Sequence, residues 1–129
     1  MLKYSRILFW LPRIMTILAI LFVSIFALDA FQPELTVTEQ WGGFVIHLVP
    51  SYLLTVILIV AWKWEYVGGI LFLVIGLLAT PYVFLGNYQV NNSLGQSILV
   101  VLSVTIPFAI VGLLFLVNHF RNKKFQSAK

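Results

Sequence analysis

The sequence predicts an all-α membrane protein, a bundle of four transmembrane helices whose neighbours run antiparallel through short loops. Of its 129 residues, 61% are hydrophobic and only 9% are charged, and the mean hydropathy is +1.03. Soluble domains carry about 25% charged residues, so a soluble fold of this length could not bury so much apolar surface. Four apolar runs, at about 14–31, 44–62, 66–85 and 97–118, are each long enough to cross a hydrocarbon core of about 30 Å as a helix.

The first run, at about 14–31, follows a basic segment and so has the outline of a secretory signal peptide. Ala-Leu-Asp-Ala at 27–30 is a poor small-x-small cleavage site, and three more spans follow, so we interpret the run as an uncleaved first helix. Residues 2–11 mix basic and aromatic side chains and are predicted to lie along the interface, with Pro12 opening the helix. One long helix kinked at Pro12 is the alternative.

The second, third and fourth runs each contain a proline, and each proline is expected to bend its helix. Pro50 should free the carbonyl of Ile46 in the second run. Pro81 lies near the end of the third run, and Pro107 lies midway through the fourth. Broken helices with polar neighbours can mark transporter sites, but ordinary kinks are commoner and are the interpretation we favour.

Small residues predict where two of the helices touch. One face of the third run and one face of the fourth carry small side chains at steps of three, four or seven residues. Because lipid gives helices no hydrophobic reason to associate, small residues that allow close backbone approach mark helix contacts in membranes. We therefore expect close packing through Gly69, Gly76 and Thr80 on one helix and Thr105, Ala109 and Gly112 on the other.

The basic residues give the expected orientation. None of the eight lies in the connections 32–43 and 86–96, so with four crossings all eight fall on one side of the membrane. The positive-inside rule places that side, both termini and the basic tail at 119–129 in the cytoplasm. The net charge of +4 comes from the ends of apolar runs, which indicates a membrane surface and no nucleic-acid partner. The basic residues are Lys3, Arg6, Arg13, Lys63, Arg121, Lys123, Lys124 and Lys129.

The sequence indicates no enzyme chemistry. The absence of cysteine excludes disulfides, thiolate metal sites and cysteine nucleophiles. The chain has two histidines, no acidic pair near a span centre, and none of the motifs G-x-S-x-G, H-E-x-x-H, P-loop and G-x-G-x-x-G. We therefore expect a protein that is not an enzyme and that has no catalytic residues, no cofactor and no metal.

Asp29 and His47 form the first candidate pair. Asp29 lies 16 residues after Arg13, and His47 lies 16 residues before Lys63. Because this length of helix climbs about 24 Å, both side chains should reach the same height, just beneath the outer surface. A carboxylate there would favour an imidazolium. We interpret the pair as a structural hydrogen bond between two helices, and a proton relay or ligand site is the alternative.

The cytoplasmic rim is the second candidate. Arg13 and Glu65 should both lie there, and an ion pair between them would pin the first helix to the second hairpin. We expect this pair to be partly exposed and therefore weak unless it is shielded. Tryptophan rings are expected to anchor the helices at headgroup depth, and the four are Trp10, Trp41, Trp62 and Trp64.

Four stretches resemble one uncharacterised family: FWLPRI at 9–14, FALDAF at 26–31, HLVP at 47–50 and AWKWEYVGGILF at 61–72. That family consists of small, multi-pass, mostly bacterial membrane proteins grouped as a domain of unknown function. The resemblance covers about residues 7–80, and its most specific motif is AWKWE followed by two glycines. It implies a multi-pass protein of the bacterial cytoplasmic membrane, and it brings no known activity, substrate or cofactor.

Together these patterns predict one transmembrane domain over 1–129, a non-enzymatic structural or interaction subunit. Its partners would be the lipid bilayer and a second copy or another membrane protein. The alternative is a small proton-coupled transporter or channel that uses Asp29 and His47. The lack of an ionisable group near a bilayer centre argues against transport. A polar path to the cytoplasm would favour transport, whereas Tyr52, Ser103 and Thr105 all facing lipid would exclude it.

Overall fold

The computed structural model describes the backbone of residues 2–128 and the side chains of residues 6–128, so Lys129 and the Lys3 side chain lie outside the described part. All regular structure between residues 2 and 128 is helical, which confirms the all-α prediction. Four segments are long and apolar enough to cross a membrane: Arg6–Ala30, Val37–Lys63, Glu65–Asn91 and Leu94–Ser127. In chain order the helices are α1 (Leu2–Ile25), the 3-10 helix η1 (Phe26–Ala30), α2 (Val37–His47), α3 (Val49–Lys63), α4 (Glu65–Asn91) and α5 (Leu94–Ser127).

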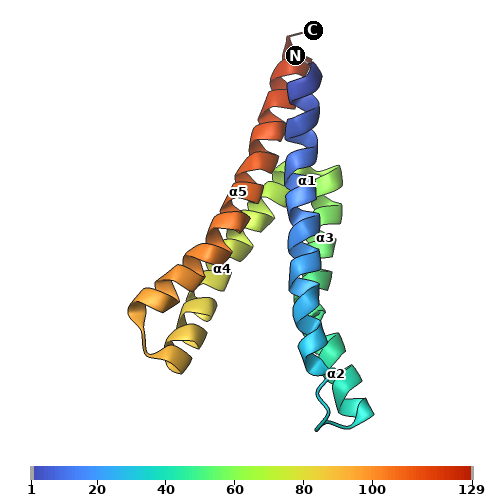
Figure 1. Ribbon diagram of the computed structural model, residues 1–129. Coiled ribbons are helices and arrows are strands. Elements are labelled where there is room, and N and C mark those ends of the chain that lie inside the picture. The colour runs from blue at the N-terminus through green and yellow to red at the C-terminus, as the bar shows by residue number, and fades with distance from the viewer. Residues whose placement is uncertain (1, 129) are drawn as a thin grey trace.

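The start of the chain differs from the favoured prediction. Residues 2–11 do not form a separate interfacial segment, because α1 runs from Leu2 to Ile25 with Pro12 inside it. The structure thus has the single long helix that was the alternative. The Arg13 guanidinium donates to the carbonyl of Phe9, close to the turn that Pro12 weakens. The first turns of α1 also pack against α5, as Figure 1 shows, and this support keeps the segment in line with the rest of the helix.

The end of the chain and its last connection are also more helical than predicted. The segment after residue 118, expected to be a tail, continues α5 as far as Ser127. The connection predicted at 86–96 reduces to two residues, since α4 ends at Asn91 and α5 begins at Leu94. Asn92 caps α4 in the left-handed conformation with φ +49°, which an asparagine tolerates well. Only Trp64 separates α3 from α4, as the minimal inner turn predicted.

The second membrane crossing is interrupted near its proline. α2 ends at His47, Leu48 forms a turn, and Pro50 lies in the first turn of α3. The bend predicted at Pro50 is therefore confirmed as a break between two helices. The start of α2 lies earlier than the predicted residue 44, because Thr36 caps the helix and forms a capping box with Glu39.

The helices form two arms that meet at one end of the molecule (Figure 1). Arm one contains α1, η1, α2 and α3, and arm two contains α4 and α5. The end where α1 begins and α5 finishes is called the closed end here, and the opposite end, where the arms diverge, is called the open end. The four-helix arrangement predicted from sequence is confirmed, but the bundle is not compact along its whole length. The core lies where the arms meet, at Leu54, Ile57, Leu58, Ala61, Phe72, Val111 and Phe115.

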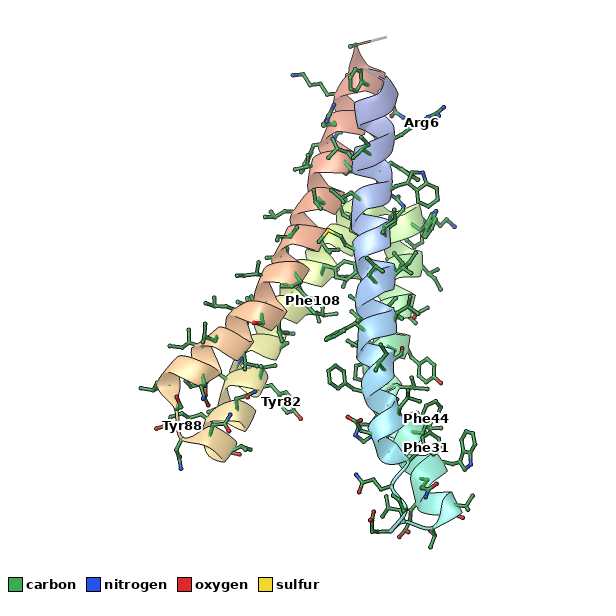
Figure 2. All side chains as sticks on the ribbon, viewed as in Figure 1. Arg6, Phe31, Phe44, Tyr82, Tyr88 and Phe108 are labelled. Carbon is green, nitrogen blue, oxygen red and sulfur yellow. The ribbon has the colours of Figure 1, made fainter. Side chains whose placement is uncertain are left out.

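Arm two has the close helix contact that its small residues predict. A Cβ atom added at Gly69 would lie 2.9 Å from the carbonyl oxygen of Gly112, so the two backbones nearly touch. Further along, the hydroxyls of Thr80 and Thr105 are 2.9 Å apart. Arm one is joined by side chains, with the hydroxyls of Ser24 and Ser51 2.9 Å apart. The aromatic rings of Phe31, Trp41 and Phe44 cluster at its tip, and Figure 2 labels two of them.

Candidate functional site

A fully buried arginine lies where the two arms meet. Arg13 projects from α1 and has 0% of its surface exposed, although it is charged. Its guanidinium carbon lies 3.6 Å from the centre of the Phe9 ring and 5.4 Å from the centres of the Trp62 and Phe115 rings. An arginine enclosed by aromatic faces in this way gains cation–π attraction but must also find a counter-charge.

The counter-charge is Glu65, the first residue of α4. Its Oε1 accepts from the Arg13 Nη2 at 2.8 Å and also from the side-chain amide of Asn118, which is buried. Its Oε2 accepts from the amide of Asn122 at 3.4 Å. We call these four residues the clamp, because they join α1 of arm one to α4 and α5 of arm two.

The ion pair predicted between Arg13 and Glu65 is confirmed, but its expected exposure is wrong. Only 12% of the Glu65 side chain is exposed, and none of Arg13 is. The reason is that Phe115 and Asn118 of α5 cover the pair. Sequence reasoning missed Asn118 and Asn122, although two amides four residues apart share one face of a helix and could have signalled a polar contact there.

A cavity of about 320 Å³ adjoins the clamp. Arg13 and Glu65 form part of its wall, together with Lys63, Tyr66 and His119. The Nε atom of Arg13 is buried and has no hydrogen-bond partner, although the other nitrogens of the same guanidinium are used. The Lys63 ammonium lies 5.0 Å from the Trp64 ring centre. The cavity wall therefore contains two cations, Arg13 and Lys63.

The predicted contact between Asp29 and His47 is wrong. Within the described residues no ion pair or hydrogen bond joins the two side chains, and both residues are exposed. The His47 ring bonds to the carbonyl of Gly43 in its own helix at 2.7 Å. Asp29 lies in η1 and not in the regular part of α1, so equal height did not bring the side chains to the same face. A proton relay built on this pair has no geometric support.

The middle of the molecule is apolar where the arms part. The cavity there has a volume of about 60 Å³ and is lined by side chains such as Met15, Leu54 and Phe72. Figure 2 places Phe108 at this fork. Exposure of Tyr52, Ser103 and Thr105 to lipid would exclude transport. Tyr52 and Ser103 are exposed, whereas Thr105 bonds to Thr80.

The four tryptophans are all exposed on the surface of the described chain, as rings that meet headgroups would be. Trp10 and Trp62 contact edge to face, with ring centres 5.9 Å apart, beside the clamp. Trp64 lines the clamp cavity, and Trp41 packs on Phe31 at the tip of arm one. The rings thus lie at two levels, one near the closed end and one at the open end.

Among the side chains that the structure describes, at residues 6–128, no three His, Asp or Glu residues lie close enough together to hold a metal ion. Neither the curated proteins nor the solved structures compared with the chain give a match. The family model described as Domain of unknown function (DUF7670) matches residues 1–127. The chain therefore belongs to that family of uncharacterised proteins, as the sequence resemblance indicated.

Proposed function

We propose that this multi-pass membrane protein is a non-enzymatic interaction subunit, which binds a membrane partner between and around its open arms. One observation carries the proposal: the arms diverge, and many of their large apolar side chains are exposed. At most 28% of any spanning window is buried within the chain. Large exposed apolar side chains run along both arms, with Val45 and Ile46 on α2 and Leu77 and Leu78 on α4 as examples.

The buried polar groups support binding over catalysis. The strongest cluster of charge, the clamp, uses both oxygens of Glu65 to hold α1, α4 and α5 together. A carboxylate with every oxygen bonded is a structural group and a poor general base. Transport is the weaker candidate, because the cavity at the fork between the arms is lined mainly by apolar side chains, and neither Asp29 nor His47 is among them.

We propose a second copy of the chain as the partner. Three glycines at the open end have no atom within 4 Å of an added Cβ: Gly42, Gly86 and Gly95. Within the same chain, Gly69 and Gly112 bring α4 and α5 into backbone contact. Because small residues mark helix interfaces in membranes, the open glycines offer α4, α5 and α2 the same kind of contact with another helix.

Single cysteines test this proposal cleanly, because the chain has none of its own. We expect Gly86→Cys to form a disulfide-linked dimer in oxidised membranes, as two copies bring their open ends together. Ile59→Cys is the matched control, since it is 64% exposed but lies near the end of α3 that leads into α4, away from the open end. Equal cross-linking of the two variants would indicate random collision and would contradict a specific contact at the open end. If both variants stay monomeric, a second copy is not the partner.

We also propose that the protein lies in the bacterial cytoplasmic membrane with both chain ends in the cytoplasm. The basic residues of α1 and α5 support this, because they gather at the closed end. In intact cells an impermeant thiol reagent should label Val37→Cys and leave Gln126→Cys unlabelled. Labelling of both from the same side would contradict four crossings.

A further inference from the structure

The cavity beside the clamp contains donors that the clamp does not use. Arg13 Nε is buried and unpartnered, and an unsatisfied buried donor costs about 1–3 kcal/mol. The two terminal nitrogens of Arg13 donate to the carbonyl of Phe9 and to Glu65. A guanidinium has five N–H groups, and Arg13 lines the cavity, so its side chain keeps donors for an acceptor that enters there.

The start of α4 lies in the wall of the same cavity. Its first residues, Glu65, Tyr66 and Val67, line the wall, and the preceding Trp64 makes no side-chain cap. A helix leaves its first N–H groups without partners inside the helix. The dipole of a helix of 27 residues also favours negative charge at this end. An anion in the cavity would lie near these N–H groups and near the positive end of the helix dipole.

The charge around the cavity favours an anion as well. Arg13 and Lys63 carry two positive charges, and Glu65 carries one negative charge, which leaves a formal charge of +1 with His119 neutral. The Glu65 carboxylate does not compete strongly for the cavity donors, because Arg13, Asn118 and Asn122 already bond to its oxygens. Lys63 is exposed and makes no ion pair within residues 6–128.

One exposed face of α1 beside this cavity is apolar. It carries Ile7, Trp10, Leu11 and Ile14. The Trp10 ring of this face contacts the Trp62 ring, which lines the cavity, with ring centres 5.9 Å apart. An acyl chain attached to a phosphate in the cavity would thus lie against this face.

We propose that the clamp cavity binds the phosphate of an anionic membrane lipid, with one acyl chain lying along α1. The tryptophans beside it belong at headgroup depth, where anionic lipids attract basic side chains. This site lies where the two arms meet and is separate from the partner surface at the open end. Its success or failure is therefore independent of whether two copies associate.

Native mass spectrometry of the full chain in detergent tests the site, with phosphatidylglycerol, phosphatidylcholine and inorganic phosphate as probes. We expect phosphatidylglycerol to bind most tightly and Lys63→Gln to weaken it by about fivefold, the effect of one basic residue near an anionic lipid. Lys124→Gln is the matched control, because Lys124 is exposed and lies outside the cavity lining. Inorganic phosphate in excess should displace only a small fraction of the bound phosphatidylglycerol.

Three outcomes would overturn the proposal. Equal loss of binding in Lys63→Gln and Lys124→Gln would indicate a diffuse basic surface. Equal binding of phosphatidylcholine and phosphatidylglycerol would indicate that the acyl chains alone are recognised. Tight binding of inorganic phosphate with none of phosphatidylglycerol would indicate a site for a soluble anion. Arg13 is left unchanged in this test because its loss would disturb the clamp itself.

Discussion

The two arms of the molecule are built in different ways. In arm two the backbones of α4 and α5 approach so closely that an added Cβ at Gly112 would lie 2.8 Å from the carbonyl oxygen of Gly69. In arm one the helices are held apart by side chains, the second crossing breaks at Leu48, and the contacts are a serine pair and an aromatic cluster. Both arms are adjacent helices of similar apolar composition.

This difference shows how helices associate where the hydrophobic effect is weak. In lipid, close packing and hydrogen bonds hold helices together, so glycine contacts fix the register of arm two along much of its length. Arm one has no such contact between α1 and α3 and relies on a few local interactions. The clamp is the polar link that ties the two different arms to each other.

The largest expected effect comes from breaking that link. Arg13→Met would leave Glu65 buried without its counter-charge, and removal of one partner of a buried pair costs about 3–5 kcal/mol. We expect this loss in the free energy of unfolding in detergent micelles. The arms should separate further while each keeps its helices, so circular dichroism at low denaturant should change little.

The double variant Arg13→Met with Glu65→Met is the control for this prediction. Replacing a buried ion pair with apolar side chains is often neutral, so the double variant should recover most of the lost stability. Additive losses in the two single variants and the double variant would show that the charges do not act as a pair.

The sequence predicted the parts of this molecule that depend on local composition. Span length follows from runs of apolar residues, and the contact between α4 and α5 follows from glycines at Gly69 and Gly112. The pairing of Arg13 with Glu65 also followed from the sequence, because both residues were expected on the cytoplasmic side of the membrane. Each of these features is set along one helix axis, where residue counts convert directly to height.

The features that sequence reasoning missed depend on rotation about the helix axes. Height placed Asp29 beside His47, but among the described residues no ion pair or hydrogen bond joins the two side chains, and His47 bonds to Gly43 in its own helix. The burial of Arg13 depends on α5, whose covering residue Asn118 comes from a segment without a recognised motif. The divergence of the arms depends on packing across all four helices, which no single segment encodes.

A change at the glycine contact should have the next largest effect, and only in arm two. Gly69→Ala would place a methyl group 2.9 Å from the Gly112 carbonyl oxygen, and overpacking costs about 1–3 kcal/mol. For monomeric protein in detergent, Gly86→Ala is the matched control on the same helix, because its added Cβ has nothing within 4 Å in its own chain. Both variants gain the same helix propensity, so the difference in their unfolding free energies reports the contact alone. Equal stabilities would mean that α4 and α5 are not in backbone contact.

The smallest expected effects concern the hydroxyl pairs, which occur in both arms with the same separation of 2.9 Å. Hydrogen bonds between membrane helices contribute about 0.6 kcal/mol on average, so we expect double-variant cycles on Ser24 with Ser51, and on Thr80 with Thr105, to give similar coupling energies. Alanine replaces each serine and valine each threonine, so that the threonine shape is kept. Similar values would assign the difference between the arms to backbone approach. A coupling several times larger for the serines would instead mean that arm one relies on its polar pair where arm two relies on glycine.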